Sequence, residues 1–322
     1  MEDQPKERFP ERPGIIFMGT PDFAVPSLRA LVEHGYDILA VVTQPDRPRG
    51  RGRKMLPSPV KRAAMELGLE ILQPQLVSTP EFCKEIRLKS PDLLVVVAFG
   101  QILKKDFLDI PRWGPLNIHA SLLPKYRGAA PIHWAVLNNE VKTGLTAMRM
   151  EVGLDSGPIL LQEEVHILSD ETSGQLHDRL AQISGKFLIR TLKGLAENRL
   201  KEKPQNENRA TYASKIDRDM SEIKWDQSAK TISAFIRAFD PWPGAFTRLG
   251  NKHIKLFSSR VINETCVDGI PGSVTGCSKG ALEVETGKGV VQIRELQAPG
   301  KKRLAAIDFL RGFPIDKNTL LG

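Results

Sequence analysis

Three short runs of uninterrupted apolar residues constrain the fold of this chain more than any other feature. They are Ile15-Ile16-Phe17, residues 38–42 and residues 93–97. A strand with one solvated face alternates apolar and polar residues, whereas a strand of a parallel sheet is covered on both faces and is apolar throughout. The runs therefore predict a parallel sheet with helices packed on both of its faces.

Helical segments separate these runs, as a parallel sheet requires. Residues 24–34, 58–67 and 79–89 carry apolar residues at helical spacing, and Ser58 and Thr79 stand at N-cap positions, each followed by proline. The alternation predicts a doubly wound, mostly parallel, Rossmann-like α/β domain over residues 14–200. Ligands bind such domains at the carboxyl ends of the strands, so the loops that follow the strands are the first candidates for a site.

The remainder of the chain predicts a second, smaller domain. Residues 201–210 are polar and contain proline, which is the composition of a linker. After one helix over 228–239, short β-type runs separated by glycines predict a small OB-like β-barrel within residues 211–322. Residues 1–13 lack an apolar core and are predicted to be a disordered tail, neither a secretion signal nor a transit peptide.

Composition excludes several classes of protein and site. Hydrophobic residues make up 41% of the chain, and no apolar run approaches the roughly 20 residues of a membrane-spanning helix, so we predict a soluble, cytoplasmic protein without a membrane partner. Cys83, Cys266 and Cys277 are too few and too far apart for a disulfide framework or a zinc site. The six histidines lack metal-binding spacing, so no metal is expected.

The loop after the first apolar run is where a dinucleotide-binding motif would lie. It has the sequence Met18-Gly19-Thr20-Pro21, which lacks the Gly-x-Gly-x-x-Gly pattern that brings a backbone close to a pyrophosphate. A dinucleotide cofactor is therefore not expected.

The densest group of chemically useful residues lies in the segment 117–132. Asn117 and His119 are two residues apart at the end of a predicted strand, so they project from the same face. An amide that can donate to a developing oxyanion, beside an imidazole that can exchange a proton near neutral pH, suits acyl transfer. Asp155 follows in a glycine-flanked loop. Each residue also has a plain structural interpretation, because a buried histidine is commonly a satisfied core residue and an Asp between glycines commonly makes a turn.

The combination of motifs is more specific than its parts. Asn-x-His-x-Ser-Leu-Leu-Pro over residues 117–124, followed by Gly-Leu-Asp-Ser-Gly over residues 153–157, resembles the signature of the folate-dependent formyltransferases. Further motifs, at residues 19–23, 43–48, 127–132 and 237–243, resemble the members of that family that act on methionyl-tRNA. The likeness covers nearly the whole chain, and the departures from it are a longer N-terminal tail and Ala120 where glycine is also common.

This resemblance implies an activity and a set of residues. It implies transfer of the formyl group of 10-formyltetrahydrofolate, a cosubstrate, to the amino group of methionine on initiator methionyl-tRNA. Asn117 would hold the formyl oxygen, and His119, oriented by Asp155, would assist loss of the proton from the amine. The folate would lie against nine residues that are equally compatible with core packing: Phe99, Gln101, Ile102, Leu103, Ser121, Leu122, Leu123, Pro124 and Val152.

Basic residues point to a partner of opposite charge. The loop 45–57 contains two glycines, three prolines and five bases, namely Arg47, Arg49, Arg51, Arg53 and Lys54. We predict that it forms no regular element, is exposed, and acts as an arm toward tRNA phosphates or the acceptor end, although a merely solvated loop has the same composition. Asp46 is a possible partner of Arg47.

Charge is also distributed unevenly between the predicted domains. Residues 1–200 hold 26 Lys and Arg against 24 Asp and Glu, an excess of +2, whereas residues 201–322 hold 20 against 14, an excess of +6. A basic second half fits a polyanion or simply a soluble basic surface. Five of its bases are candidates to extend an electrostatic track for RNA: Lys252, Lys255, Lys301, Lys302 and Arg303.

Other functions share part of this pattern. A formyltransferase for an amino-sugar nucleotide, or a formyltetrahydrofolate hydrolase, would use the same Asn, His and Asp. A noncatalytic RNA-binding module on an α/β scaffold would explain the charge but would leave the combination of Asn117, His119 and Asp155 without a purpose. We predict a monomeric enzyme that uses tRNA.

Overall fold

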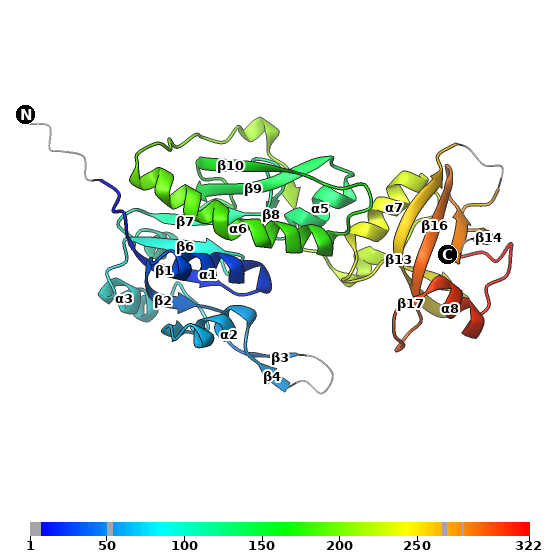
Figure 1. Ribbon diagram of the computed structural model, residues 1–322, viewed down its shortest axis with the longest axis horizontal. Coiled ribbons are helices and arrows are strands. Elements are labelled where there is room, and N and C mark those ends of the chain that lie inside the picture. The colour runs from blue at the N-terminus through cyan, green and yellow to red at the C-terminus, as the bar shows by residue number, and fades with distance from the viewer. Residues whose placement is uncertain (1–7, 50–53, 266–268, 279) are drawn as a thin grey trace, which may run out of the picture. The chain divides into compact units, whose positions relative to one another are not determined.

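A computed structural model describes residues 8–49, 54–265, 269–278 and 280–322 (Figure 1). The chain forms two compact units that are not divided by a single cut in the sequence. Unit 1 contains the residues up to Ala129 together with Thr143–Val165 and His177–Ala213. Unit 2 contains Ala130–Lys142, His166–Leu176 and Ser214–Gly322.

Unit 1 is built on a seven-stranded sheet with the order β10-β9-β7-β6-β1-β2-β5. The strands β5, β2, β1, β6 and β7 pair with one another in parallel, and β9 pairs antiparallel with β7. The order reverses at β1, which lies between β2 and β6. The bounds are β1 (Gly14–Gly19), β2 (Asp37–Val42), β5 (Ile71–Leu72), β6 (Leu93–Val97), β7 (Pro115–His119), β9 (Lys142–Arg149) and β10 (Ile159–His166).

Helices cover both faces of this sheet. One face buries Ile16, Met18, Leu94 and Val96 in a cluster with residues of α3 (Pro80–Leu88) and α4 (Lys105–Leu108). The alternate residues of the same strands are also buried. This explains why the strands are apolar throughout, since neither face meets solvent.

Helix α1 (Val25–Glu33) packs against the part of α6 (Ser173–Ala196) that belongs to unit 1 (Figure 1). Ser27 and Ser184 share a buried hydrogen bond of 2.9 Å, and a Cβ on Gly185 would lie 2.8 Å from the Pro26 carbonyl oxygen. Small residues therefore allow the two helices to approach closely. The 3-10 helix η1 (Asp22–Ala24) leads into α1.

The expected helix starts are present. The Ser58 hydroxyl accepts the Lys61 N–H at the start of α2 (Pro59–Glu66), and the Thr79 hydroxyl accepts the Phe82 N–H at the start of α3. These caps satisfy backbone donors that a helix leaves unpaired in its first turn. Together with the strand order and the helices on both faces of the sheet, these caps confirm the predicted doubly wound α/β fold.

Unit 2 contains an antiparallel sheet of the order β12-β13-β16-β15-β14, with β17 paired to β16. This confirms the predicted β-rich second part of the fold. Its strands are β12 (Phe246–Leu249), β13 (Lys252–Asn263), β14 (Val274–Ser278), β15 (Ala281–Glu285), β16 (Val290–Gln297) and β17 (Leu304–Ala305). Its helices are α5 (Pro131–Leu137), α7 (Ala229–Ala238), the 3-10 helix η3 (Arg218–Ser221) and α8 (Ala306–Gly312).

Part of the predicted disordered tail is ordered. Phe9 is buried, and its ring meets the ring of Trp113 edge-on at a centroid distance of 5.5 Å. A single aromatic residue in a polar stretch thus anchors residues 8–13, while residues 1–7 lie outside the described residues. Among the described residues, no helix is long and apolar enough to cross a membrane.

A substitution at Gly144 in β9 would test how closely the outer strands of the unit 1 sheet pack. A Cβ on Gly144 would lie 2.0 Å from the backbone oxygen of Glu163 and 2.7 Å from Leu122 Cδ2. Gly144→Ala should therefore lower the free energy of unfolding by about 1–3 kcal/mol, the usual cost of overpacking, as measured by urea denaturation. The control is Gly276→Ala, since a Cβ at Gly276 meets no atom within 4 Å; equal losses in both variants would show that close packing of β9 against β10 is not the cause.

Candidate active site

Asn117 and His119 lie on β7, which is flanked by β6 and β9. Both side chains are largely buried, with 8% and 7% of their surface exposed, and the two-residue spacing places them on one face as predicted. Within the part of the chain that the structure describes, no side-chain hydrogen bond occupies the Asn117 amide. A buried amide of this kind keeps its donors available for a ligand.

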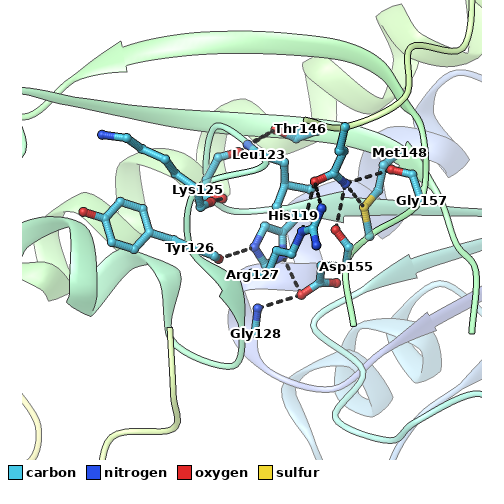
Figure 2. Close-up of polar contacts among 12 residues, drawn as sticks. His119, Leu123, Lys125, Tyr126, Arg127, Gly128, Thr146, Met148, Asp155 and Gly157 are labelled. Carbon is cyan, nitrogen blue, oxygen red and sulfur yellow. Dashed lines mark hydrogen bonds and ion pairs between the residues drawn. The ribbon is translucent and has the colours of Figure 1, made fainter. Parts of the chain in front are cut away.

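The ring of His119 is fixed from one side by the backbone. Its Nε2 lies 2.9 Å from the carbonyl oxygen of Tyr126, which can only accept a hydrogen bond (Figure 2). Nε2 therefore carries a proton, and in the neutral ring Nδ1 holds a lone pair. Nδ1 lies 3.7 Å from Asp155 Oδ2.

Asp155 joins this group from the loop between β9 and β10. Its backbone is left-handed, with φ of +48°, and its Oδ2 accepts the Gly128 N–H at 2.8 Å. The shortest hydrogen bond of the carboxylate is thus to Gly128, and the imidazole lies at ion-pair rather than hydrogen-bond distance. The structure brings the three predicted catalytic residues together and shows that Tyr126 also orients His119.

Thr146 holds the loop that carries the Tyr126 carbonyl. It is fully buried on β9 opposite His119, and its hydroxyl donates to the Ser121 carbonyl at 2.6 Å. The same hydroxyl accepts the Leu123 N–H at 3.1 Å and the Gln162 amide at 3.0 Å. One threonine therefore satisfies both a donor and an acceptor of the loop backbone.

Arg127 anchors the other end of this loop. Only 2% of its surface is exposed, and its guanidinium donates to Glu207 at 2.7 and 2.9 Å and to the Gln205 side-chain oxygen at 2.9 and 3.1 Å. The hydrogen bond from Arg127 lowers the pKa of Glu207. The short strands β8 (Arg127–Gly128) and β11 (Tyr212–Ala213) also pair here, next to the 3-10 helix η2 (Glu207–Arg209).

The nine predicted folate residues fall into three groups. Phe99, Leu103, Leu123 and Ser121 are buried, and Ser121 donates to the Lys125 carbonyl at 2.6 Å. Ile102 and Val152, by contrast, are 84% and 69% exposed. The other three are half-buried: Leu122, Pro124 and Gln101, whose amide contacts the Val77 N–H and the Gln75 carbonyl.

A cavity of about 240 Å³ lies at the carboxyl ends of β1, β2 and β6. This is where the strand order reverses, the usual ligand-binding position of a doubly wound sheet. Its wall includes Thr20, Gln44 and Phe99, and the Phe99 carbonyl accepts hydrogen bonds from the other two at 2.9 and 3.5 Å. Arg47 and Leu56 also line it.

The prediction that residues 45–57 form no regular element is wrong. The strands β3 (Arg47–Arg49) and β4 (Lys54–Leu56) pair antiparallel. Pro48 is compatible with a two-stranded ribbon because proline is tolerated where no ladder hydrogen bond is needed. Arg51 and Arg53 lie outside the described residues.

The suggested pairing of Asp46 with Arg47 is also wrong. Asp46 Oδ2 lies 2.7 Å from Lys61 Nζ, and Asp46 Oδ1 accepts a hydrogen bond from the Gln73 amide nitrogen at 2.8 Å. The hydrogen bond from Lys61 lowers the pKa of Asp46. Arg47 instead donates to the Gln44 side chain at 3.3 Å, at the rim of the cavity.

Sequence reasoning missed several residues that support the site. A backbone carbonyl such as that of Tyr126 has no sequence signature, and Thr146 resembles any other strand residue. Gln205 and Glu207 belong to the segment whose composition predicts a linker. Their only signal is the motif position of their partner Arg127. Across the described residues, no group of three or more His, Cys, Asp or Glu side chains is placed to hold a metal ion.

Comparison with known proteins covers both parts of the chain. A family model described as formyl transferase matches residues 14–192, and one described as formyl transferase, C-terminal domain, matches residues 215–314. Relatives named methionyl-tRNA formyltransferase match nearly the whole chain. Those from Pelotomaculum thermopropionicum and Geobacter metallireducens are each 47% identical over 96% of this chain and 98% of their own length. The relative from Moorella thermoacetica is 46% identical over 96% of this chain and 99% of its own length.

Solved structures share the fold at lower identity. HypX from Aquifex aeolicus in complex with tetrahydrofolic acid has a TM-score of 0.63 and 17% identity; the match covers 97% of this chain but 51% of HypX, so this chain spans about half its length. WlaRD, a sugar 3N-formyl transferase, has a TM-score of 0.66 and 21% identity over 90% of this chain and 98% of its own. At such identities the likeness shows the fold alone.

Two buried threonines on β9 test the support of the His119 loop. Thr146→Val removes the hydroxyl that pairs with Ser121 and Leu123, so two buried backbone groups lose partners and the free energy of unfolding should fall by about 2–4 kcal/mol. Thr143 is the matched control, because its buried hydroxyl has no partner among the described residues. Thr143→Val should be neutral or stabilising in the same urea denaturation, and a Thr146→Val variant as stable as this control would contradict the proposed support.

Proposed function

Because the chain belongs to the formyl transferase family, we propose that it transfers the formyl group of 10-formyltetrahydrofolate to the α-amino group of methionine on initiator methionyl-tRNA. The observation that carries the proposal is the grouping of three side chains: Asn117 and His119 are buried on one face of β7, and the Asp155 carboxylate lies 3.7 Å from the His119 ring. Relatives of 45–47% identity named for this reaction support the choice of acceptor. The product, formylmethionyl-tRNA, serves translation initiation.

The Asn117 amide, which makes no side-chain hydrogen bond among the described residues, suits the formyl oxygen. When the amine attacks, the carbonyl carbon becomes tetrahedral and its oxygen gains negative charge. An amide donor held on a rigid strand stabilises that charge without reorganising. The amine is already a nucleophile when neutral, so positioning and charge stabilisation suffice and no covalent enzyme intermediate is needed.

His119 suits the transfer of the amine proton. The Tyr126 carbonyl holds the proton of Nε2, which leaves the lone pair of Nδ1 to accept a proton from the attacking nitrogen. The resulting imidazolium lies 3.7 Å from the Asp155 carboxylate, which stabilises its charge. The proton then passes to the departing folate nitrogen as its bond to the formyl carbon breaks.

Two exposed apolar side chains support the proposed folate site. Ile102 and Val152 lie on loops that follow β6 and β9, and a pterin ring is a flat surface that such side chains can cover. The segment from Ser121 to Pro124 would line the same cosubstrate. Buried Phe99, Leu103 and Leu123 would support this site from behind, and Gln101 would hold its loop in place.

The β3–β4 hairpin is the proposed contact for tRNA. It carries Arg47, Arg49 and Lys54 and joins the strand end at the cavity beside Thr20 and Gln44. Arg51 and Arg53 lie between its two strands in the sequence. Bases at this place suit phosphates of the acceptor end, and the basic excess of residues 201–322 would add affinity.

Incubation with methionyl-tRNA and 10-formyltetrahydrofolate tests the activity and the role of Asn117 together. The wild-type protein should produce formylmethionyl-tRNA, and Asn117→Ala should lower kcat by about 10²–10³ because one oxyanion donor is lost. Binding of tRNA should change little. Asn251→Ala, in an exposed turn, is the control. Formylation of an amino-sugar nucleotide without formylation of methionyl-tRNA would overturn the proposal.

Single replacements in the hairpin separate two modes of tRNA contact. If its bases act only by charge, Arg49→Ala, Arg51→Ala and Arg53→Ala should weaken all tRNAs alike, each reducing the salt slope by about one. We expect instead that at least one of them lowers kcat/KM more for the initiator than for elongator methionyl-tRNA, because this arm lies near the reacting amine. Arg87→Ala, on the exposed side of α3, is the control. Initiator-to-elongator ratios equal to wild type in all three variants would reduce the hairpin to a nonspecific clamp.

A further inference from the structure

The amide of Gln205 connects two parts of the candidate active site. Its oxygen accepts hydrogen bonds from Arg127 Nε and Nη2 at 3.1 and 2.9 Å. Its nitrogen donates to the carbonyl oxygens of Asp155 and Gly157 at 2.7 and 2.8 Å. Two donors and two acceptor sites are all that a glutamine side chain has, so its hydrogen-bonding capacity is fully used.

The Asp155 loop depends on such contacts because most of it is exposed to solvent. Residues 151–154 are exposed, and Leu154 has 58% of its surface in solvent. Asp155 adopts a left-handed backbone conformation that non-glycine residues enter at a cost. Hydrogen bonds to its own carbonyl and to that of Gly157 therefore determine where its carboxylate lies.

The other end of the bridge is rigid. Arg127 is buried and held by Glu207, and the N–H of the next residue, Gly128, donates to Asp155 Oδ2. The Asp155 carboxylate and the Asp155 backbone are thus both tied to the same short strand, one directly and one through Gln205. This closes a ring of hydrogen bonds beside His119.

We propose that Gln205 is a positioning residue for formyl transfer, which sets the distance between the Asp155 carboxylate and the His119 imidazole. The inference rests on the proposed function. Glutamine suits the task because it offers donors on one side and an acceptor on the other. Glutamate would place an oxygen against two carbonyl oxygens, and asparagine is one methylene shorter.

The test uses kinetics of the full-length chain with methionyl-tRNA and 10-formyltetrahydrofolate. Gln205→Met keeps the length and volume of the side chain and removes its four hydrogen bonds to Arg127 and the Asp155 loop. Its kcat should fall by about 10- to 100-fold, because displacements near 1 Å cost this much when reacting groups must be aligned. KM for both substrates should change less than about threefold on the same argument, since the hydrogen-bonding groups of Gln205 are committed to Arg127 and the Asp155 loop. Gln227→Ala, which removes an exposed glutamine of unit 2, is the control for an unchanged kcat.

A double-mutant cycle separates positioning from a general loosening of the site. In an Asp155→Asn background, Gln205→Met should lower kcat by less than about threefold, since residues that act as a unit are not additive. A full additional loss in that background would overturn the proposal, as would a folded Gln205→Met variant with wild-type kcat.

Folding is monitored by circular dichroism at the assay temperature. If Gln205→Met does not fold, Gln205→Glu provides the test, because it retains the acceptor for Arg127 while losing both donors to the Asp155 loop, and its kcat should fall similarly. Failure of both variants to fold would make Gln205 a folding residue and overturn the proposal. A wild-type protein that does not formylate methionyl-tRNA would instead refute the proposed function.

Discussion

The hydrogen bond between His119 Nε2 and the Tyr126 carbonyl determines what the candidate active site can do. A neutral imidazole has two tautomers, and a partner that can only accept selects the one with the proton on Nε2. The lone pair is then on Nδ1, on the side of Asp155. Reversal of this hydrogen bond would require the carbonyl to donate, which it cannot do. The proton-accepting nitrogen is thus chosen by a main-chain atom.

Much of the surrounding structure keeps that carbonyl in place. Tyr126 has a left-handed backbone with φ of +62°, and its N–H donates to the Thr211 hydroxyl at 2.9 Å. Thr146 and Arg127 fix the loop before and after it. A carbonyl in an irregular loop has no ladder to hold it, so side chains from β9 and from residues 205–211 take the place of a neighbouring strand. The geometry of the candidate active site is a property of several segments that are distant in sequence.

Because distant segments hold this loop, the sequence predicts only part of the fold and of the candidate site. The strands β1, β2 and β6 and the caps at Ser58 and Thr79 are predictable, because apolar runs and cap residues are local signals. Strand geometry predicts that Asn117 and His119 share a face. Only the family resemblance predicts that Asp155 lies beside them. The Tyr126 carbonyl, Thr146 and Gln205 are not predictable, since their roles arise from contacts between residues that are 7 to 78 positions apart in the chain.

The errors have equally physical causes. The prolines and glycines of residues 45–57 predict irregular structure, yet a two-stranded ribbon needs few ladder hydrogen bonds and tolerates Pro48. Phe9 is one aromatic residue in a polar tail. The polar composition of the tail predicts disorder and does not show that a single ring anchors it against Trp113. In both cases the average composition of a segment fails to show the structural role of a few of its residues.

Charge in residues 201–322 shows the same limit of sequence interpretation, and here the limit bears on function. An ion pair cancels one base against one acid, so the excess of +6 over residues 201–322 persists however the charges are paired. Pairing does determine where the excess lies. Arg303 contacts both Asp240 and Glu295 and stacks over Phe257, so that group carries net negative charge. Burial lowers the pKa of Lys255, whose ammonium donates to the Pro243 carbonyl.

Two of the five candidate bases of this region are therefore committed to holding unit 2 together. Lys301 and Lys302, by contrast, are exposed beside Arg303 in the sequence. A phosphate backbone is attracted by bases whose charge faces solvent, and exchanging an internal ion pair for a phosphate contact gains little. A count of basic residues consequently gives the strength of attraction for a polyanion, but only the pairing pattern indicates the surface on which it binds.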